Sequence, residues 1–404
     1  MTPDGSNPFS AVDATLGYLY QVRSALLWAL RRLKSGPEFL ISVETQDDVT
    51  FETTGGEATD LLQTKHHLKK AASLTDASPD LWKTLRIWFE GRSSGQIPPI
   101  AILSLVTTAT AGIGSAASRL RETGRDVLAA QQALDATASS STNKNNILAY
   151  AAYLRATAAE RTAVLERIVI IDAAPTVADL DGELRAEVYW ASGKRHHAAF
   201  LDRLEGWWLR RVLRQLTGSG QGRIGSVEIE TQMSDLREQF KPESLPIDED
   251  LLEFALDEAT KLAHEDSGFV RQLGIIKAGQ RRIFAAIRDY YRAFEQRSRW
   301  LRDDLVVGLD LGKYEKRLTE EWELAFAAMG DDLGMDATSE AKEKVARALL
   351  AWAERATIAI RPNVSEPFIC RGSFHMLADE ARIGWHIDFK DLLATLLRAK
   401  EESK

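Results

Sequence analysis

Acidic, amide and basic side chains lie at the ends of three short segments near the start of the chain. Glu44 ends the first segment, and Asp47 and Asp48 precede the second. The third segment ends with Gln63 and Lys65. Carboxylate oxygens suit Mg²⁺, which keeps waters and takes phosphate oxygens as its remaining ligands. A lysine beside such a cation can stabilise the charge of a phosphate under attack, so these residue types indicate a metal-dependent phosphodiesterase site.

This chemistry requires the three segments to be neighbouring β-strands. Their β-branched and aromatic residues predict strands over residues 38–44, 49–53 and 60–65. Residues two apart on a strand share a face, so Gln63 and Lys65 should point the same way and Thr64 the opposite way. Acidic residues and lysines also occur at solvated strand ends, so the residue types alone leave a purely structural role open.

The remaining elements of the first hundred residues support a compact α/β unit. Apolar residues at helical spacing predict a helix over residues 9–33, which Gly36-Pro37 terminates. A second helix begins at Ser78-Pro79, and residues 101–108 are typical of a buried strand. Helix, three strands, helix and strand form an N-terminal domain predicted to span residues 1–115.

From residue 116 to 404 the sequence predicts an α-helical domain, which makes the whole chain α+β. Residues 268–305 are expected to form one long helix, with nine Lys/Arg and two acids between Arg271 and Arg302. Three interpretations of this basic face are open: it is solvated, it binds DNA, or it binds an acidic partner protein. The tail over residues 368–397 is rich in Gly, His and aromatics and is expected to depart from plain helix packing. Its His375 and His386 lack an evident nucleophile, so a structural role is favoured over acid–base chemistry.

Composition excludes several classes of protein. The 404 residues are 45% hydrophobic and 27% charged, and the net charge of −8 argues against a uniformly basic nucleic-acid coat. The single cysteine, Cys370, rules out an internal disulfide framework and suits a reducing cytoplasm. The longest apolar stretch, residues 97–113, is interrupted by Pro and Gly, so we expect a cytoplasmic protein without a membrane span.

The order and spacing of these motifs resemble the restriction-endonuclease-like fold. Its signature is an acidic residue on a hairpin followed by (D/E/Q)-x-K on the next strand. More narrowly, residues 9–110 resemble the double-stranded DNA nuclease domain of CBASS anti-phage effectors. The residues that carry the resemblance are Gly17-Tyr18-Leu19-Tyr20-Gln21, Val43-Glu44, Asp47-Asp48-Val49, Leu62-Gln63-Thr64-Lys65-His66-His67, Leu74-Thr75-Asp76 and Asp80-Leu81-Trp82-Lys83-Thr84-Leu85.

The resemblance implies catalytic roles for three of these residues. Asp48 and Gln63 would bind Mg²⁺, with Mn²⁺ as an alternative cation, and Lys65 would be the catalytic lysine. Many relatives have a carboxylate where Gln63 stands, and an amide binds cations less strongly. The metal affinity would therefore depend mainly on carboxylates, and a catalytically degenerate head that binds DNA without cutting it remains an alternative.

The resemblance also implies supporting residues. Glu44 would be an additional metal ligand, and Gln21 would complete the wall of the site. Either Asp47 or Asp48 could be the main ligand; Asp48 is favoured because it abuts the apolar strand residue Val49. His66 and His67 could be further ligands, although a histidine pair after a strand is more often a surface feature.

The tail widens the resemblance to the whole chain. Residues 371–378 (RGSFHMLA) and 383–386 (IGWH) are similar to the C-terminal segment of proteins encoded beside an SMC-like ATPase in three-component defence operons. Together, head and tail resemble the nuclease subunit of a Lamassu anti-phage system. This resemblance implies partnership with the ATPase and a third small subunit. The ATPase would hold the nuclease inactive until it senses foreign DNA, after which the nuclease would self-associate and cut double-stranded DNA. A helical scaffold without catalysis and a CBASS effector are the competing interpretations.

Overall fold

The computed structural model describes residues 12–34, 36–67, 72–220, 222–334 and 337–402. It separates into two compact units. The first contains Met1–Ala191 and Phe200–Asp235, and the second contains Ser192–Ala199 and Leu236–Lys404. A mixed sheet lies in the first unit and the second unit is helical, so the predicted α+β class is confirmed.

A six-stranded mixed sheet forms the centre of the first unit, with strand order β7-β5-β3-β2-β1-β8. Strands β1, β2 and β3 are antiparallel neighbours, whereas β5 and β7 continue parallel to β3. Two further short strands, β4 and β6, pair separately. The strands are β1 Leu40–Val43, β2 Val49–Glu52, β3 Ala58–Lys65, β4 Ser73–Leu74, β5 Ile102–Thr107, β6 Thr110–Ala111, β7 Ile168–Ile171 and β8 Ile224–Gly225.

The predicted helix, three strands, helix and strand are all present, but the first unit extends past the predicted boundary at residue 115. Ile168 of β7 pairs with Leu103 of β5, and Gly225 of β8 pairs with Leu40 of β1. Both outer strands of the sheet therefore come from the region predicted to be a separate helical domain. The strands are only four and two residues long, too short to stand out from the surrounding helical pattern.

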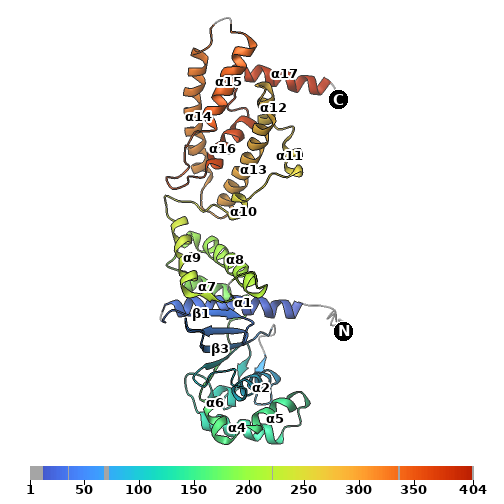
Figure 1. The fold of residues 1–404 in the computed structure, drawn as a ribbon, viewed down its shortest axis with the longest axis vertical. Helices are drawn as coiled ribbons and strands as arrows, with labels where there is room; N and C mark the ends of the chain where they lie inside the picture. Colours follow the sequence, from blue (N-terminus) through green and yellow to red (C-terminus); the bar gives the residue numbers. More distant parts are fainter. Residues whose placement is uncertain (1–11, 35, 68–71, 221, 335–336, 403–404) are drawn as a thin grey trace. The chain divides into compact units, whose positions relative to one another are not determined.

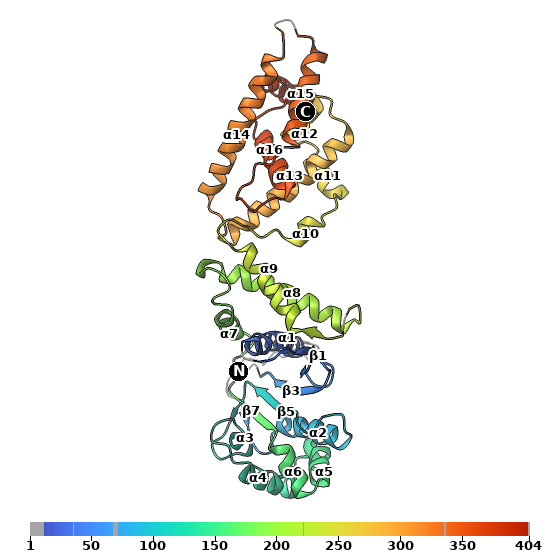
Figure 2. The same ribbon diagram turned by 60° about the vertical axis from the view of Figure 1, so that its left-hand side comes forward.

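Helices cover both faces of this sheet (Figures 1 and 2). Helix α1 lies beside β1, whereas α2, α4, α5 and α6 gather on the other side. Trp82, Leu85 and Trp88 of α2 are fully buried with Leu61 and Leu105 of the sheet, which fixes α2 over β3 and β5. The helices from this part of the chain are α1 Val12–Leu33, α2 Pro79–Ser93, α3 Ala116–Arg119, α4 Val127–Ser140, α5 Ile147–Arg155, α6 Ala158–Leu165, α7 Leu180–Glu187, α8 His197–Leu216 and α9 Ser226–Gln239, with 3₁₀ turns at Lys144–Asn146 and Lys194–His196.

The second unit is a helical bundle. Its helices are α10 Glu249–Leu252, α11 Glu258–His264, α12 Gly268–Ile275, α13 Gln280–Arg302, α14 Gly308–Asp331, α15 Ser339–Ala353, α16 Pro367–Asp379 and α17 Phe389–Glu402. The single long helix predicted over residues 268–305 is wrong, because the chain breaks between α12 and α13. Lys277 has a φ of 54° there, and Gly279 caps the start of α13. The tail was expected to depart from plain helix packing, but most of it lies in α16 and α17.

Helices α13 and α16 pack closely at a glycine. A Cβ at Gly372 would overlap the backbone oxygen of Asp289 and the Cβ of Ala293, so only glycine allows this approach. Beside it, Arg371 Nε donates to Asp289 Oδ2 at 2.6 Å. The lack of a side chain at Gly372 allows the two helices to approach, and the ion pair between Arg371 and Asp289 stabilises their contact.

Within the described residues, no helix has both the length and the apolar character needed to cross a bilayer.

Candidate functional site

The start of β2 and the end of β3 bring the predicted site residues together. The Asp48 carboxylate accepts hydrogen bonds from the Thr64 backbone N–H (2.7 Å) and the Thr64 hydroxyl (2.9 Å) through Oδ2. Its other oxygen, Oδ1, accepts from Gln63 Nε2 at 3.2 Å. These contacts form because the antiparallel register places Val49 opposite Leu62. Asp48 is partly exposed, so its carboxylate lies at the edge of the site that solvent reaches.

Gln63 and Lys65 share one face of β3, as the strand periodicity predicts. Lys65 Nζ donates to Gln63 Oε1 at 2.9 Å. Gln63 is 5% exposed, whereas Lys65 is partly exposed. Asp48, Gln63 and Lys65 therefore form one connected group, in which Gln63 is buried and Asp48 and Lys65 are partly exposed.

Asp47 lies on the buried side of this group, with 6% of its surface exposed. Its Oδ2 accepts from the indole Nε1 of Trp88 at 3.0 Å. Its Oδ1 accepts from the Asp48 backbone N–H at 3.0 Å and from the Gln63 amide. Burial raises the pKa of Asp47 to about 7; the Trp88 hydrogen bond opposes this shift and the nearby Asp48 charge adds to it. The two aspartates therefore differ in burial: Asp47 is buried and Asp48 is partly exposed.

Gln21 and Glu44 contact the backbone of Asp48. Gln21 on α1 donates through Nε2 to the Asp48 carbonyl at 3.1 Å and is 5% exposed, which places it in the wall where it was predicted. Glu44 is exposed, with a φ of 54°, and its backbone N–H donates to the same carbonyl at 3.0 Å. Among the described residues, no hydrogen bond or ion pair joins the Glu44 carboxylate to the other site side chains. Its charge adds to burial in raising the pKa of Tyr18.

The two histidines that follow β3 have partners outside the carboxylate cluster. His67 Nε2 lies 2.8 Å from Asp80 Oδ2, and its backbone N–H donates to the Thr108 hydroxyl. The ring of His66 lies 4.8 Å from that of Tyr20. These contacts favour a role in shaping the flank of the site over metal ligation.

The donor atoms of the cluster fit a cation of the Mg²⁺ type. No group of three or more His, Cys, Asp or Glu in the described part of the chain is arranged to hold a metal. Mg²⁺, however, commonly takes only one or two protein carboxylates and fills its other positions with water and phosphate. Here the Asp47 and Asp48 carboxylates lie side by side, and Lys65, the cation of the cluster, bonds to Gln63 instead of to either of them. The Asp48 carboxylate and the amide oxygen of Gln63 are donors of the oxygen type that such a cation prefers.

Two participants were not recognised from the sequence. Trp88 was interpreted as a core residue, which is correct for its ring, but its indole N–H reaches Asp47. A buried tryptophan needs an acceptor for this N–H, and that requirement is the signal that could have identified the contact. Thr64 was assigned to the opposite layer, yet it binds Asp48 through its backbone and hydroxyl groups.

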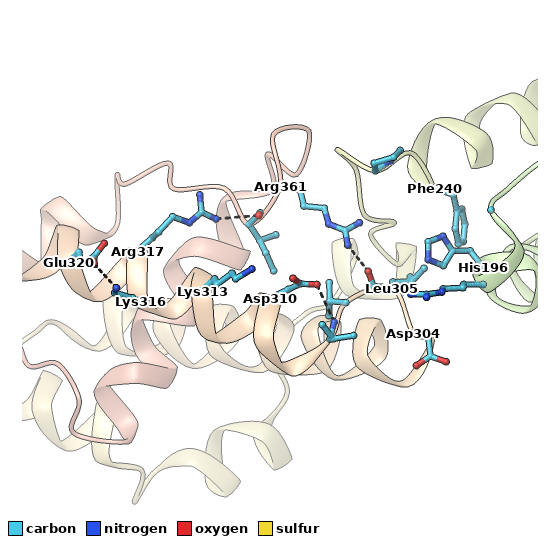
Figure 3. Close-up of a pocket in the computed structure, with 16 residues that line it drawn as sticks. His196, Phe240, Asp304, Leu305, Asp310, Lys313, Lys316, Arg317, Glu320 and Arg361 are labelled. Atoms are coloured by element: carbon cyan, nitrogen blue, oxygen red, sulfur yellow. Dashed lines mark hydrogen bonds and ion pairs between the residues drawn. The ribbon is translucent and has the colours of Figure 1, made fainter.

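A second candidate site lies in the helical unit, where a groove of about 960 Å³ is open to solvent. Figure 3 shows its lining, which combines an apolar floor including Leu305 with charged side chains along its edges. Arg317 and Arg361 donate to backbone carbonyls instead of carboxylates, and Lys316 is 3.5 Å from Glu320. The cationic lining residues are Arg195, Lys313, Lys316, Arg317 and Arg361, against the acidic Asp304, Asp310 and Glu320. The excess of positive charge over an apolar floor suits an acidic protein segment.

The arginines of α13, the basic helix predicted from the sequence, form ion pairs within the helical unit. Arg282 of α13 bonds to Glu354 at 2.7 Å, Arg297 bonds to Glu315, and Arg299 bonds to Asp250 at 2.7 Å. These arginines pair with carboxylates of the same unit, so much of the charge of α13 is neutralised internally.

In class, the chain is thus an α+β protein with an acid, amide and lysine cluster on a mixed sheet, joined to a helical unit. Residues 269–393, within that helical unit, match the family model described as C-terminal domain 7 of the ABC-three component systems. This match supports a role in a defence system of several components. No curated protein matched the chain.

Proposed function

We propose that the chain is a Mg²⁺-dependent endonuclease that cuts double-stranded DNA as the effector of a bacterial anti-phage complex. The observation that supports this most is the connected group of Asp48, Gln63 and Lys65 at adjacent strand ends. The order of helix, three strands, helix and strand predicted from the sequence patterns is also present.

Each residue of the site has a role in this proposal. Asp48 and the Gln63 carbonyl oxygen would hold the cation, with Glu44 contributing from the solvent side. A bound Mg²⁺ would polarise the phosphate and lower the pKa of a coordinated water. Lys65, which is partly exposed, would stabilise negative charge on the phosphate with its ammonium group. Gln21 would fix the Asp48 backbone.

The helical unit would dock the chain to its partners. The family match supports a system of several components, and the resemblance of the tail favours an SMC-like ATPase and a third small subunit of the Lamassu kind. We assign the acidic segment of a partner to the groove beside Lys313 and Arg361, on the basis of charge complementarity. Self-association is part of the proposal, because cutting both strands with single-site heads takes at least two of them.

Replacing the lysine tests the catalytic assignment. Lys65→Ala should reduce plasmid cleavage by the assembled complex at least about a hundredfold, because it removes a charge that acts on the reacting phosphate. Its stability should change by less than about 0.5 kcal/mol, since the side chain is partly exposed. Lys144→Ala, which alters an exposed lysine of the first unit away from the site, is the matched control and should cut normally. Undiminished cutting by purified Lys65→Ala would contradict the assignment.

A head that binds DNA without cutting is the second candidate, and Gln63 is the observation that favours it, because an amide replaces a carboxylate. Cleavage assays of the assembled complex with Mg²⁺, Mn²⁺ and EDTA separate the two functions. DNA binding without cleavage under all three conditions would support the degenerate head.

A further inference from the structure

The buried half of the site is a chain of hydrogen bonds that begins in the hydrophobic core. Trp88 has no exposed surface, and its indole N–H donates to Asp47 Oδ2 at 3.0 Å. The other Asp47 oxygen accepts from the Gln63 amide, whose Oε1 accepts from Lys65. The order Trp88, Asp47, Gln63, Lys65 therefore links a core residue of α2 to the cation at the site surface.

Charge determines which way the Gln63 amide faces. Its NH₂ group lies against the carboxylates of Asp47 and Asp48, and its carbonyl lies against the Lys65 ammonium group. The flipped amide would set its oxygen against two carboxylates and its NH₂ against a cation, which reverses every contact from attraction to repulsion. The carboxylates thus hold the carbonyl oxygen toward Lys65 and the open side of the site.

The two aspartates accept hydrogen bonds from different donors and differ in exposure. Asp47 receives the rigid indole N–H of a fully buried ring and is itself 6% exposed. Asp48 receives its contacts from Thr64 and Gln63 and is partly exposed. A ligand must reach a cation that also contacts substrate and water, and of the two aspartates Asp48 is the more exposed.

We infer that Asp47 is a positioning residue: anchored by Trp88, it orients the Gln63 amide so that the carbonyl faces Lys65, and Asp48 alone supplies the carboxylate of this pair to a cation. The inference rests on the proposed nuclease function for its catalytic consequence. The hydrogen-bond chain itself exists in the protein without metal or DNA, so it can be tested separately.

The first experiment measures the chain directly in the full-length protein. In ¹⁵N-labelled protein, the Trp88 indole N–H signal is assigned from its loss in Trp88→Phe. At alkaline pH, where the Asp47 carboxyl group is ionised, Asp47→Asn should move that signal upfield, because a charge-assisted hydrogen bond is replaced by a weaker one. Adding Mg²⁺ to the wild type should leave the signal within a small fraction of that displacement. A shift on Mg²⁺ addition as large as that in Asp47→Asn would make Asp47 a ligand and overturn the inference.

The second experiment compares Mn²⁺ affinity by electron paramagnetic resonance. Asp48→Asn should weaken Mn²⁺ binding at least tenfold, whereas Asp47→Asn should stay within about threefold of the wild type. Equal losses for the two variants would refute the division of roles. If the wild type binds no Mn²⁺ and cuts no DNA, the proposed function fails, while the indole signal still decides whether Trp88 anchors Asp47.

Matched tryptophan variants and an exchange variant test positioning against a general structural effect. Trp88→Phe should lower cleavage about tenfold. Trp82→Phe removes an indole bond from the same helix to the Asp76 carbonyl, away from the site, and should cut normally. Gln63→Glu should lose activity through carboxylate repulsion, and combining it with Asp47→Asn should restore it, because amide and carboxylate have exchanged places. Equal losses in Trp82→Phe and Trp88→Phe, or no rescue in the exchange variant, would count against positioning.

Discussion

His375 should make the helical unit lose stability below neutral pH. The side chain lies on α16, is 3% exposed and packs beside the rings of Phe269 and Trp385. Burial lowers the pKa of His375 from 6.5 to about 4; Asp289 opposes this shift, and Arg371 and Arg282 reinforce it. The folded protein therefore keeps the imidazole neutral at pH values where the unfolded chain binds a proton.

The size of the effect follows from the two pKa values. Above pH 6.5 both states are neutral at this residue, and the stability is complete. As the pH falls toward about 4, the unfolded state gains a proton that the folded state excludes, at 1.36 kcal/mol per pH unit. The total loss is about 3 kcal/mol, and about 2 kcal/mol of it falls between pH 7 and pH 5.

The assay is urea unfolding of the full chain at a series of pH values, followed by hydrogen-exchange mass spectrometry of α16 peptides. His375→Leu should remove most of the pH dependence of this helix between pH 7 and 5. Phe374→Leu is the matched control: Phe374 is fully buried but does not titrate, so the variant should lose stability equally at all pH values. If the wild type and His375→Leu have the same slope, the assigned protonation state of His375 is wrong.

Two further perturbations test the helical unit. Gly372→Ala should destabilise the helical unit by about 1–3 kcal/mol in urea unfolding, because the added Cβ overlaps α13. Gly312→Ala, in an open position on α14, should be neutral or slightly stabilising in the same assay. Equal effects of the two variants would refute the close approach. Lys313→Glu combined with Arg195→Glu should weaken association with the proposed ATPase partner about tenfold in sedimentation experiments, while Lys344→Glu, on α15, should not. An unchanged double variant would exclude the groove as the docking surface.

Local patterns predicted the centre of the first unit well. The strands at residues 40–43, 49–52 and 58–65 lie within or beside their predicted ranges, because β-branched and aromatic residues alternate with turn signals there. The outer strands β7 and β8 could not be predicted, because these short segments become strands only through pairing with β5 and β1. The same limit explains the boundary at residue 115, which followed local composition and not long-range pairing.

The sequence predicted that Asp48, Gln63 and Lys65 lie near one another, but it did not predict the hydrogen bonds that connect them. Strand periodicity placed Gln63 and Lys65 on one face, and the spacing of Asp48 brought it to the same end of the sheet. The unequal burial of Asp47 and Asp48 depends on the position of α2, which residue order does not specify. The break at Lys277 was missed for a related reason, since a single residue in the left-handed region leaves the apolar periodicity on either side intact.

The indole of Trp88 has a consequence for when the cluster can assemble. Its ring settles only after α2 has docked on the sheet, so the Asp47 anchor is absent from any chain that is still partly folded. A newly made or damaged molecule would then carry every acidic and basic residue of the cluster without the Trp88 contact. In the proposed nuclease, such dependence on a completed core would act as a safeguard for the host DNA during synthesis.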